Sequence, residues 1–193
     1  MATIEQKRQF IEEHEERFAG ALASAVIEKP QLSFWMILIP IIFVYYMYRI
    51  PRYAEGKKRF TEHYLMSRKS ALHEAAASIL NGSEPDAARL AASNDIPLDV
   101  QPLMKDLIAV LIAHYAGLLR AEGSDFDSLV RSAYRDRTAF LLVMNRLSEA
   151  ERKLYATLSG RLEQDQEGSD SAVRTIEQES ERMRREEAER IFS

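Results

Sequence analysis

The chain has 193 residues, of which 46% are hydrophobic and 29% charged, and its formal net charge at pH 7 is -4. It contains no cysteine, which excludes disulfide frameworks, thiol nucleophiles and cysteine-ligated metal sites. A weakly acidic chain of this length has room for one membrane segment and one modest helical domain, and it lacks the basic excess of a nucleic-acid-binding protein.

Residues 1–30 are predicted to form an amphipathic helix. Thr3 followed by Gln6 makes a capping-box start, and apolar side chains then recur on one helical face, opposite an acidic face. The apolar positions are Ile11, Phe18, Leu22 and Val26. Because the helix carries more acid than base, we expect it to pack on protein, either a partner or its own domain, in preference to lipid.

Residues 32–48 hold no charge and are typical of a membrane segment. At about 1.5 Å rise per residue they extend about 26 Å, the short end of what spans a hydrocarbon core. Trp35 near one end and three tyrosines near the other resemble interfacial aromatic belts. No small-residue cleavage site follows, so we expect a retained transmembrane helix over 31–50 and not a signal peptide. Pro40 would kink this helix, and the structural alternative is a re-entrant hairpin with both ends on one face.

Basic residues follow the apolar segment. Within about twenty residues, two Lys or Arg precede it and six follow it, which predicts that the C-terminal side is cytoplasmic. We therefore expect a single-pass protein, with a bacterial inner membrane as the default location. Five of these cations are candidate contacts for anionic lipid headgroups, although a topology signal alone explains them equally well. They are Arg49, Arg52, Lys57, Lys58 and Arg59.

Residues 51–162 are predicted to form a bundle of four or five helices. The expected helices cover 57–80, 83–92, 103–119, 124–147 and 148–162. The last two are joined so tightly that they must either continue in line with a kink or fold back as an antiparallel pair. Asn81-Gly82 is expected to stop the first of them. The segment 103–119 is the most apolar, and the length of its uncharged part is typical of a core helix, with a second membrane span as the alternative. No alternating pattern predicts a strand, so the predicted fold is all-α.

Residues 163–193 are predicted to form a linker and a charged helix. Residues 163–170 have no apolar side chain and are interpreted as the linker. Residues 171–193 then carry a thin apolar stripe flanked by opposite charges four residues apart. This pattern indicates either a solvated helix or a weak coiled coil, which would make the protein a homo-oligomer.

No catalytic, cofactor-binding or metal-binding motif is evident in the sequence. The seven glycines are scattered, so no phosphate-binding loop can be written, and the four histidines match neither helical zinc nor di-iron patterns. His114 and Arg137 are the polar residues on the predicted core faces, and they could form a buried polar layer. We interpret this layer as satisfied core hydrogen bonding in preference to a ligand site.

The sequence therefore predicts function only through architecture. We expect a membrane-anchored helical interaction protein, such as a scaffold, assembly factor or accessory subunit, whose partners are the bilayer and a membrane or cytoplasmic protein. The alternative is a membrane-tethered enzyme or ligand-binding protein with its polar site inside the bundle, around His114 and Arg137. The sequence favours the interaction protein over the enzyme and indicates no cofactor.

Overall fold

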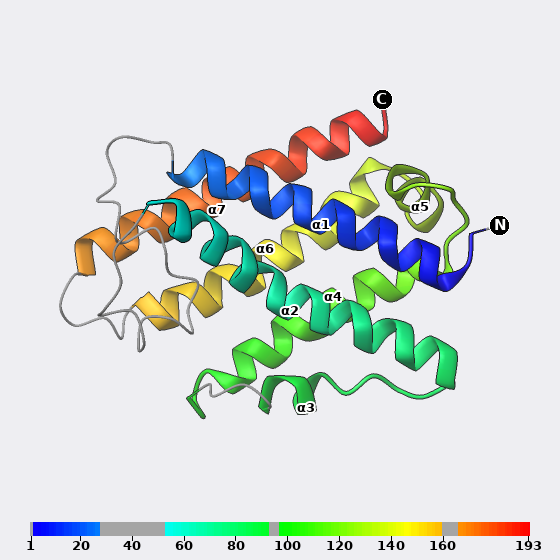
Figure 1. Ribbon diagram of the computed structural model, residues 1–193, viewed down its shortest axis with the longest axis horizontal. Coiled ribbons are helices and arrows are strands. Elements are labelled where there is room, and N and C mark those ends of the chain that lie inside the picture. The colour runs from blue at the N-terminus through cyan, green and yellow to red at the C-terminus, as the bar shows by residue number, and fades with distance from the viewer. Residues whose placement is uncertain (1, 28–52, 93–96, 160–165) are drawn as a thin grey trace.

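The computed structural model describes residues 2–27, 53–92, 97–159 and 166–193. In these ranges the fold is all-α, with seven helices and no strand (Figure 1). The predicted membrane segment 32–48 lies outside the described residues. The helices are α1 (Ile4–Ile27), α2 (Tyr53–Asn81), α3 (Ala87–Ala92), α4 (Gln101–Arg120), α5 (Phe126–Ala133), α6 (Arg137–Ser159) and α7 (Gln166–Ile191).

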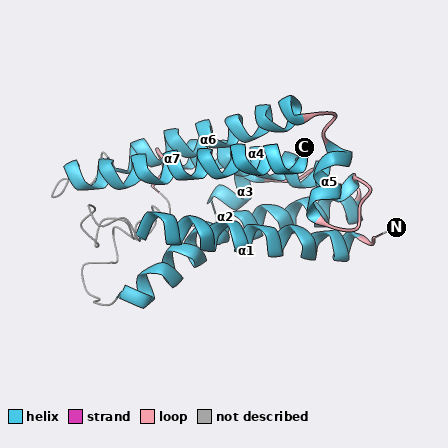
Figure 2. Ribbon diagram, turned by 90° about the horizontal axis from the view of Figure 1, so that it is seen from above, coloured by secondary structure: helices cyan, strands magenta, loops and turns pink. Residues whose placement is uncertain are grey.

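Five long helices form a closed ring. α1 packs against α2, α2 against α4, α4 against α6, α6 against α7, and α7 returns to α1. Figure 2 shows α1 and α2 on one side of the bundle and α6 and α7 on the other. The two short helices lie outside this ring: α3 covers α4 and α2, and α5 lies against α1, α4 and α7.

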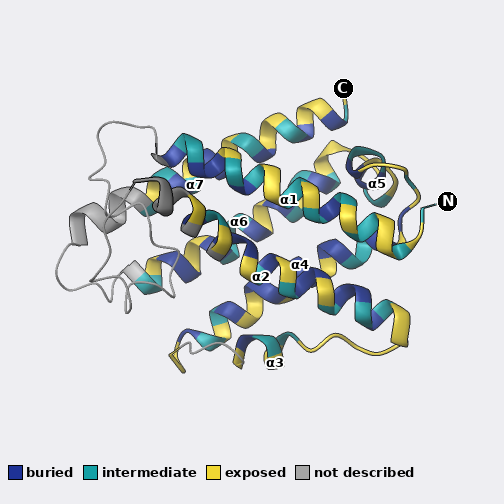
Figure 3. Cartoon of the chain, viewed as in Figure 1, coloured by how far each residue is buried: buried dark blue, intermediate teal, exposed yellow. Residues whose placement is uncertain are grey.

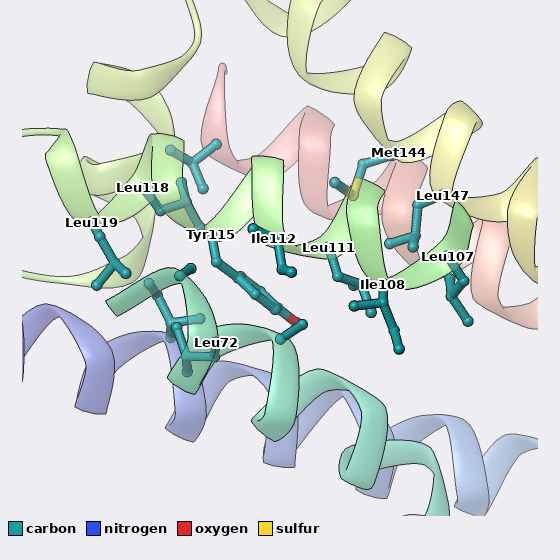
Figure 4. Close-up of a cluster of buried hydrophobic side chains, with 14 of the residues drawn as sticks. Leu72, Leu107, Ile108, Leu111, Ile112, Tyr115, Leu118, Leu119, Met144 and Leu147 are labelled. Carbon is teal, nitrogen blue, oxygen red and sulfur yellow. The ribbon is translucent and has the colours of Figure 1, made fainter. Parts of the chain in front are cut away.

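Buried residues lie along the helix faces that are turned toward the inside of the bundle (Figure 3), and most of them are apolar. Side chains of α4 fill the centre, between Leu72 of α2 and Met144 and Leu147 of α6 (Figure 4). A second buried cluster joins the C-terminal half of α1 to the start of α2, with one residue each from α6 and α7. Burying this much apolar surface is the main force that stabilises the bundle.

The N-terminal helix packs into its own bundle. Leu22 and Val26 are fully buried in the second cluster, and Phe18 is partly buried against it. The predicted capping box is confirmed, because the Thr3 backbone N donates to Gln6 Oε1 over 2.9 Å and the Gln6 backbone N donates to Thr3 Oγ1 over 3.2 Å. The acidic amphipathic helix therefore finds its protein partner within the same chain.

α4 confirms the predicted core helix. It is also long and apolar enough to cross a membrane by length and composition, yet half of its most apolar window is buried inside the bundle. Because a core helix passes the same test, this is weak evidence for a membrane span. The predicted end of α2 is confirmed as well: the helix finishes at Asn81, and Gly82 follows with φ 65°, a left-handed conformation that glycine adopts without strain.

Two predicted boundaries in the second half are wrong. The expected helix 124–147 is broken, because the Asp136 carboxylate accepts the backbone N–H of Ala139 over 2.9 Å and so caps a new helix, α6. The expected start at Ser148 does not exist, and α6 runs through it to Ser159. Ser148 and Glu151 have the three-residue spacing of a capping box, which is why a helix start is expected there, but both side chains bind Arg184 on α7.

The charged tail is not a solvated helix. α7 begins at Gln166, inside the predicted linker, and packs along α6 and α1. Three of its buried residues are apolar, namely Ile176, Ala188 and Ile191. Three more are polar or charged, namely Glu179, Ser180 and Arg184. Polar residues of α7 such as Ser180 are thus also part of the interior.

Candidate functional site

The predicted lipid-contacting cations are mostly outside what the structure describes. Arg49 and Arg52 lie outside the described residues, and only the backbone of Lys57 and Arg59 is described, in α2. Lys58 is exposed near the start of α2, where its Nζ lies 3.8 Å from Glu62 Oε1. Their contact with lipid headgroups stays a prediction.

The predicted polar layer of His114 and Arg137 is wrong. His114 is buried in α4, but Arg137 is exposed at the first turn of α6 and donates to Glu189 on α7 over 2.6 Å. The cap at Asp136 breaks the helix that was expected to carry Arg137 on its inner face. His114 instead meets Tyr134, whose Oη lies 2.5 Å from His114 Nδ1.

Burial keeps His114 neutral. Desolvation lowers the pKa of His114 to about 4, and the nearby Glu15 carboxylate offsets this only in part. At neutral pH the imidazole therefore carries no charge. In a neutral imidazole one ring nitrogen donates a hydrogen bond and the other accepts one, which suits a core position beside a hydroxyl group.

A buried ion pair network, absent from the sequence prediction, lies at the centre of the ring. Arg68 of α2 is 3% exposed, and its Nε lies 3.0 Å from Glu15 Oε2 of α1. Its Nη2 donates to Glu151 of α6, and its guanidinium lies over the Tyr64 ring, 3.7 Å from the centroid. A buried guanidinium needs such partners because an unpaired charge in the interior is strongly destabilising.

The network continues in both directions from Arg68. On one side Tyr115 Oη of α4 donates to Glu15 Oε1 over 2.8 Å. On the other, Arg184 Nη2 of α7 donates to Glu151 Oε2 over 2.8 Å. We call Tyr115, Glu15, Arg68, Glu151 and Arg184 the five-helix network, since each of the five ring helices contributes one member.

The charges of the five-helix network balance. Burial alone would raise the pKa of Glu151, but Arg184 and Arg68 more than offset this and hold the pKa below its ordinary value. Burial also raises the pKa of Tyr115, and the adjacent Glu15 raises it further, so its hydroxyl stays protonated and donates. Two guanidinium cations therefore face two carboxylate anions. Buried charges in this arrangement are better suited to fixing helix register than to acid-base catalysis.

A sequence signal exists for the two arginines of the network. Arg68 follows Phe60 and Tyr64 at four-residue steps, in line with the inner face of α2. Arg184 likewise falls between Ser180 and Ala188 on α7, four residues from each. A charged residue at a core position predicts a buried partner, but the sequence does not say which residue supplies it.

A cavity of about 640 Å³ opens beside the network, between α1, α5 and α7. His14 forms part of its wall: its Nε2 lies 2.6 Å from Glu187 Oε1, and its ring stacks on Phe126 with centroids 3.5 Å apart. An inner cavity of about 20 Å³ lies behind it and reaches Arg68 and Arg184. The two cavities share four lining residues, which are His14, Phe18, Phe126 and Glu187.

No group of three or more His, Cys, Asp or Glu side chains in the described ranges could hold a metal ion. Comparisons with protein-family models, with curated proteins and with solved structures find no match. Functional inference therefore rests on the contacts of the chain itself.

Proposed function

We propose that this protein is a membrane-attached helical scaffold whose whole bundle lies on one face of the membrane. The apolar segment 32–48 would enter and leave the bilayer on the same side. The observation that carries this proposal is the packing of α1 against α2, the helices that flank the segment. Their contact includes the buried ion pair between Glu15 and Arg68.

A single span would separate helices that pack together. It would place α1 on one side of the membrane and α2 to α7 on the other, leaving the buried Arg68 without Glu15 and exposing the apolar face of α2. Losing one partner of a buried ion pair costs about 3–5 kcal/mol. The re-entrant alternative therefore replaces the single-pass topology expected from the sequence.

The sequence of the segment fits a shallow hairpin. Divided at Pro40, each arm has about eight residues and would reach about 12 Å as a helix. This is enough to enter one leaflet of a hydrocarbon core about 30 Å thick. The proline removes a backbone donor at the point where the chain would turn.

The flanking cations favour the cytoplasmic face of a bacterial inner membrane. Residues 12–31 carry two Lys or Arg and residues 49–68 carry six, and a hairpin would keep all of them on one side. Arg68 is buried in the five-helix network and Arg17 lines the cavity between α1, α5 and α7, so six of the eight remain as candidates for headgroup contact. Cations next to a membrane are attracted to anionic headgroups by about 1 kcal/mol each. Lys58 is exposed and available for such a contact.

We propose that the bundle acts by binding another membrane or cytoplasmic protein, as a scaffold, assembly factor or accessory subunit. In the described part of the chain, the charged groups at the core of the bundle pair with one another. Pairing between the helices of the bundle thus explains why these charged groups are buried there. A stoichiometric partner captured from mild detergent and identified by mass spectrometry would name the process.

Membrane attachment is tested by extraction with alkaline carbonate. The wild-type protein should stay with the membrane, whereas Leu38→Lys with Ile42→Lys should release it, since each central Lys costs about 2.5–3.5 kcal/mol in a membrane. Leu142→Lys is the matched control, because Leu142 is apolar and 54% exposed on α6. Release of the wild type, or retention of the double variant, would contradict the proposal.

A further inference from the structure

The cavity between α1, α5 and α7 has the size and walls of a small-molecule site. Its volume of about 640 Å³ falls within the range of known ligand pockets, about 300–1,000 Å³. Phe18, Phe126 and Met183 supply apolar walls, and α1, α5 and α7 contact one another around it (Figure 1). An aromatic or aliphatic body could be buried against these side chains.

The carboxylates around the cavity are already engaged. Arg190 binds Asp127 through both of its terminal nitrogens and also lies 3.7 Å from Glu187. Glu187 has His14 as its second partner. Glu186 pairs with Arg182 over 2.6 Å. Asp125 forms no salt bridge among the described residues; it accepts the backbone N–H of Ser128 over 2.8 Å, which lowers its pKa, and Arg131 contributes to this lowering of the pKa. These acids are therefore poorly placed to receive a cationic ligand.

Two guanidinium groups of the same cavity, those of Arg17 and Arg131, form no salt bridge with a carboxylate among the described residues, although Arg131 interacts with Asp125 at longer range. Arg17 Nε donates to the backbone O of Glu13 over 3.3 Å, and Arg131 Nη1 donates to the backbone O of Ile191 over 3.2 Å. A neutral carbonyl accepts a hydrogen bond without cancelling the charge of the donor. Guanidinium groups with free N–H donors favour carboxylate and phosphate, which they bind in a bidentate way.

The wall between the two cavities holds further unused hydrogen-bonding capacity. His14 Nδ1 and Tyr64 Oη are buried and have no hydrogen-bond partner among the described protein groups. His14 lines both cavities, and Tyr64 lines the inner one. Because buried polar atoms are rarely left unpaired, such atoms mark a place where a polar ligand atom or a water belongs.

We propose that this cavity binds a small soluble organic anion, a carboxylate or a phosphate that carries an aromatic ring. Arg17 and Arg131 would hold the anionic group, and Phe18, Phe126 and Met183 would receive the ring. His14 lies thirteen residues before Ile27, the last residue of α1, which is about 20 Å along the helix. The site therefore lies about 20 Å along α1 from the end of the helix that precedes the apolar segment.

The proposal is tested by calorimetric titration of the full chain in mild detergent. Phenyl phosphate is the probe; phenethylammonium is its cationic counterpart, and inorganic phosphate is the anion without a ring. Arg17→Gln combined with Arg131→Gln removes the unpaired charges. Arg185→Gln is the matched control, since Arg185 is exposed on α7 and lines none of the cavities described above.

We expect saturable binding of phenyl phosphate that weakens at least about tenfold, or about 1.4 kcal/mol, in the double variant and is unchanged in Arg185→Gln. Inorganic phosphate should bind more weakly and phenethylammonium should not bind. Equal affinity in the double variant, or preference for the cation, would overturn the proposal. The absence of saturable phenyl phosphate binding up to about 10 mM would overturn it as well. If inorganic phosphate bound as tightly as phenyl phosphate, the proposed contact of Phe18, Phe126 and Met183 with an aromatic ring would be refuted.

Discussion

Replacing Arg68 by methionine tests whether the five-helix network stabilises the bundle. Methionine keeps much of the aliphatic length but removes the guanidinium group, so Glu15 loses its 3.0 Å contact and Glu151 keeps only Arg184. The carboxylate left without a cation is that of Glu15, whose side chain is 13% exposed, so water has little access to the remaining charge. We expect the free energy of unfolding to fall by about 3–5 kcal/mol, as for other buried pairs that lose one partner.

A second substitution should restore part of this loss. Adding Glu15→Gln to Arg68→Met removes one negative charge and leaves the Glu151–Arg184 pair intact, with its 2.8 Å contact. The network is then neutral again. The double variant should therefore be more stable than Arg68→Met alone, with an interaction energy of about 0.5–3 kcal/mol between the two sites.

Lys69 provides the matched control. It is the next residue of α2 and also has two carboxylate partners on α1, Glu12 at 3.0 Å and Glu16 at 2.6 Å, but it is 43% exposed. Lys69→Met should cost less than about 1 kcal/mol, because water screens exposed pairs. Urea unfolding in mild detergent, followed by circular dichroism, measures all three variants. If Arg68→Met loses no more stability than Lys69→Met, the reasoning is refuted.

Three further predictions concern the stability of the bundle, measured by urea unfolding or, for the last of them, by thermal unfolding. Tyr115→Phe removes a hydrogen bond to the partly buried, charged carboxylate of Glu15 and should cost about 1.5–3 kcal/mol. Tyr64→Phe removes a hydroxyl without a protein partner among the described residues and should change stability by less than about 1 kcal/mol. Equal losses in the two variants would contradict this prediction. The folded protein protonates His114 near pH 4 and the unfolded chain near 6.5, so stability should fall by about 1.4 kcal/mol per pH unit as the pH drops from 6.5 to 4. His114→Gln should remove this pH dependence of stability, whereas His73→Gln, at an exposed position, should retain it. Identical pH profiles for the two variants would contradict the assignment of the pH dependence to His114. Deleting residues 166–193 should lower the melting temperature, because α7 packs into the bundle, and an unchanged melting temperature would show that it does not.

Local patterns predicted the helices well where the chain itself supplies the signal. The capping box at Thr3, the stop at Asn81 and the apolar run of α4 each depend on residues close in sequence, and the structure confirms all three. The boundary at Ser148 failed because the same residue types that cap a helix also bind a distant arginine. Sequence alone cannot separate these two uses.

The buried network was missed for a related reason. Charged residues at core positions are visible in the sequence, but Arg68 and Glu151 are 83 residues apart and their pairing depends on the closed ring of helices. The same reasoning, that a charged residue at a core position is buried with a partner, selected Arg137. It failed for Arg137 because a cap at Asp136 starts a new helix just before that residue. Counting charges likewise says nothing of tertiary contacts, so the packing of α1 against α2 could not be predicted from the cations that flank the apolar segment.

The central claim, that α1 and the rest of the bundle lie on one side of the membrane, can be measured directly. Because the chain has no cysteine, Gln9→Cys in α1 and Ser193→Cys at the C-terminus each introduce a single exposed thiol. An impermeant maleimide added to intact spheroplasts should give the same result at both positions, protection until the membrane is permeabilised. Labelling of position 9 with protection of position 193 would show that the segment spans the membrane and would contradict the account.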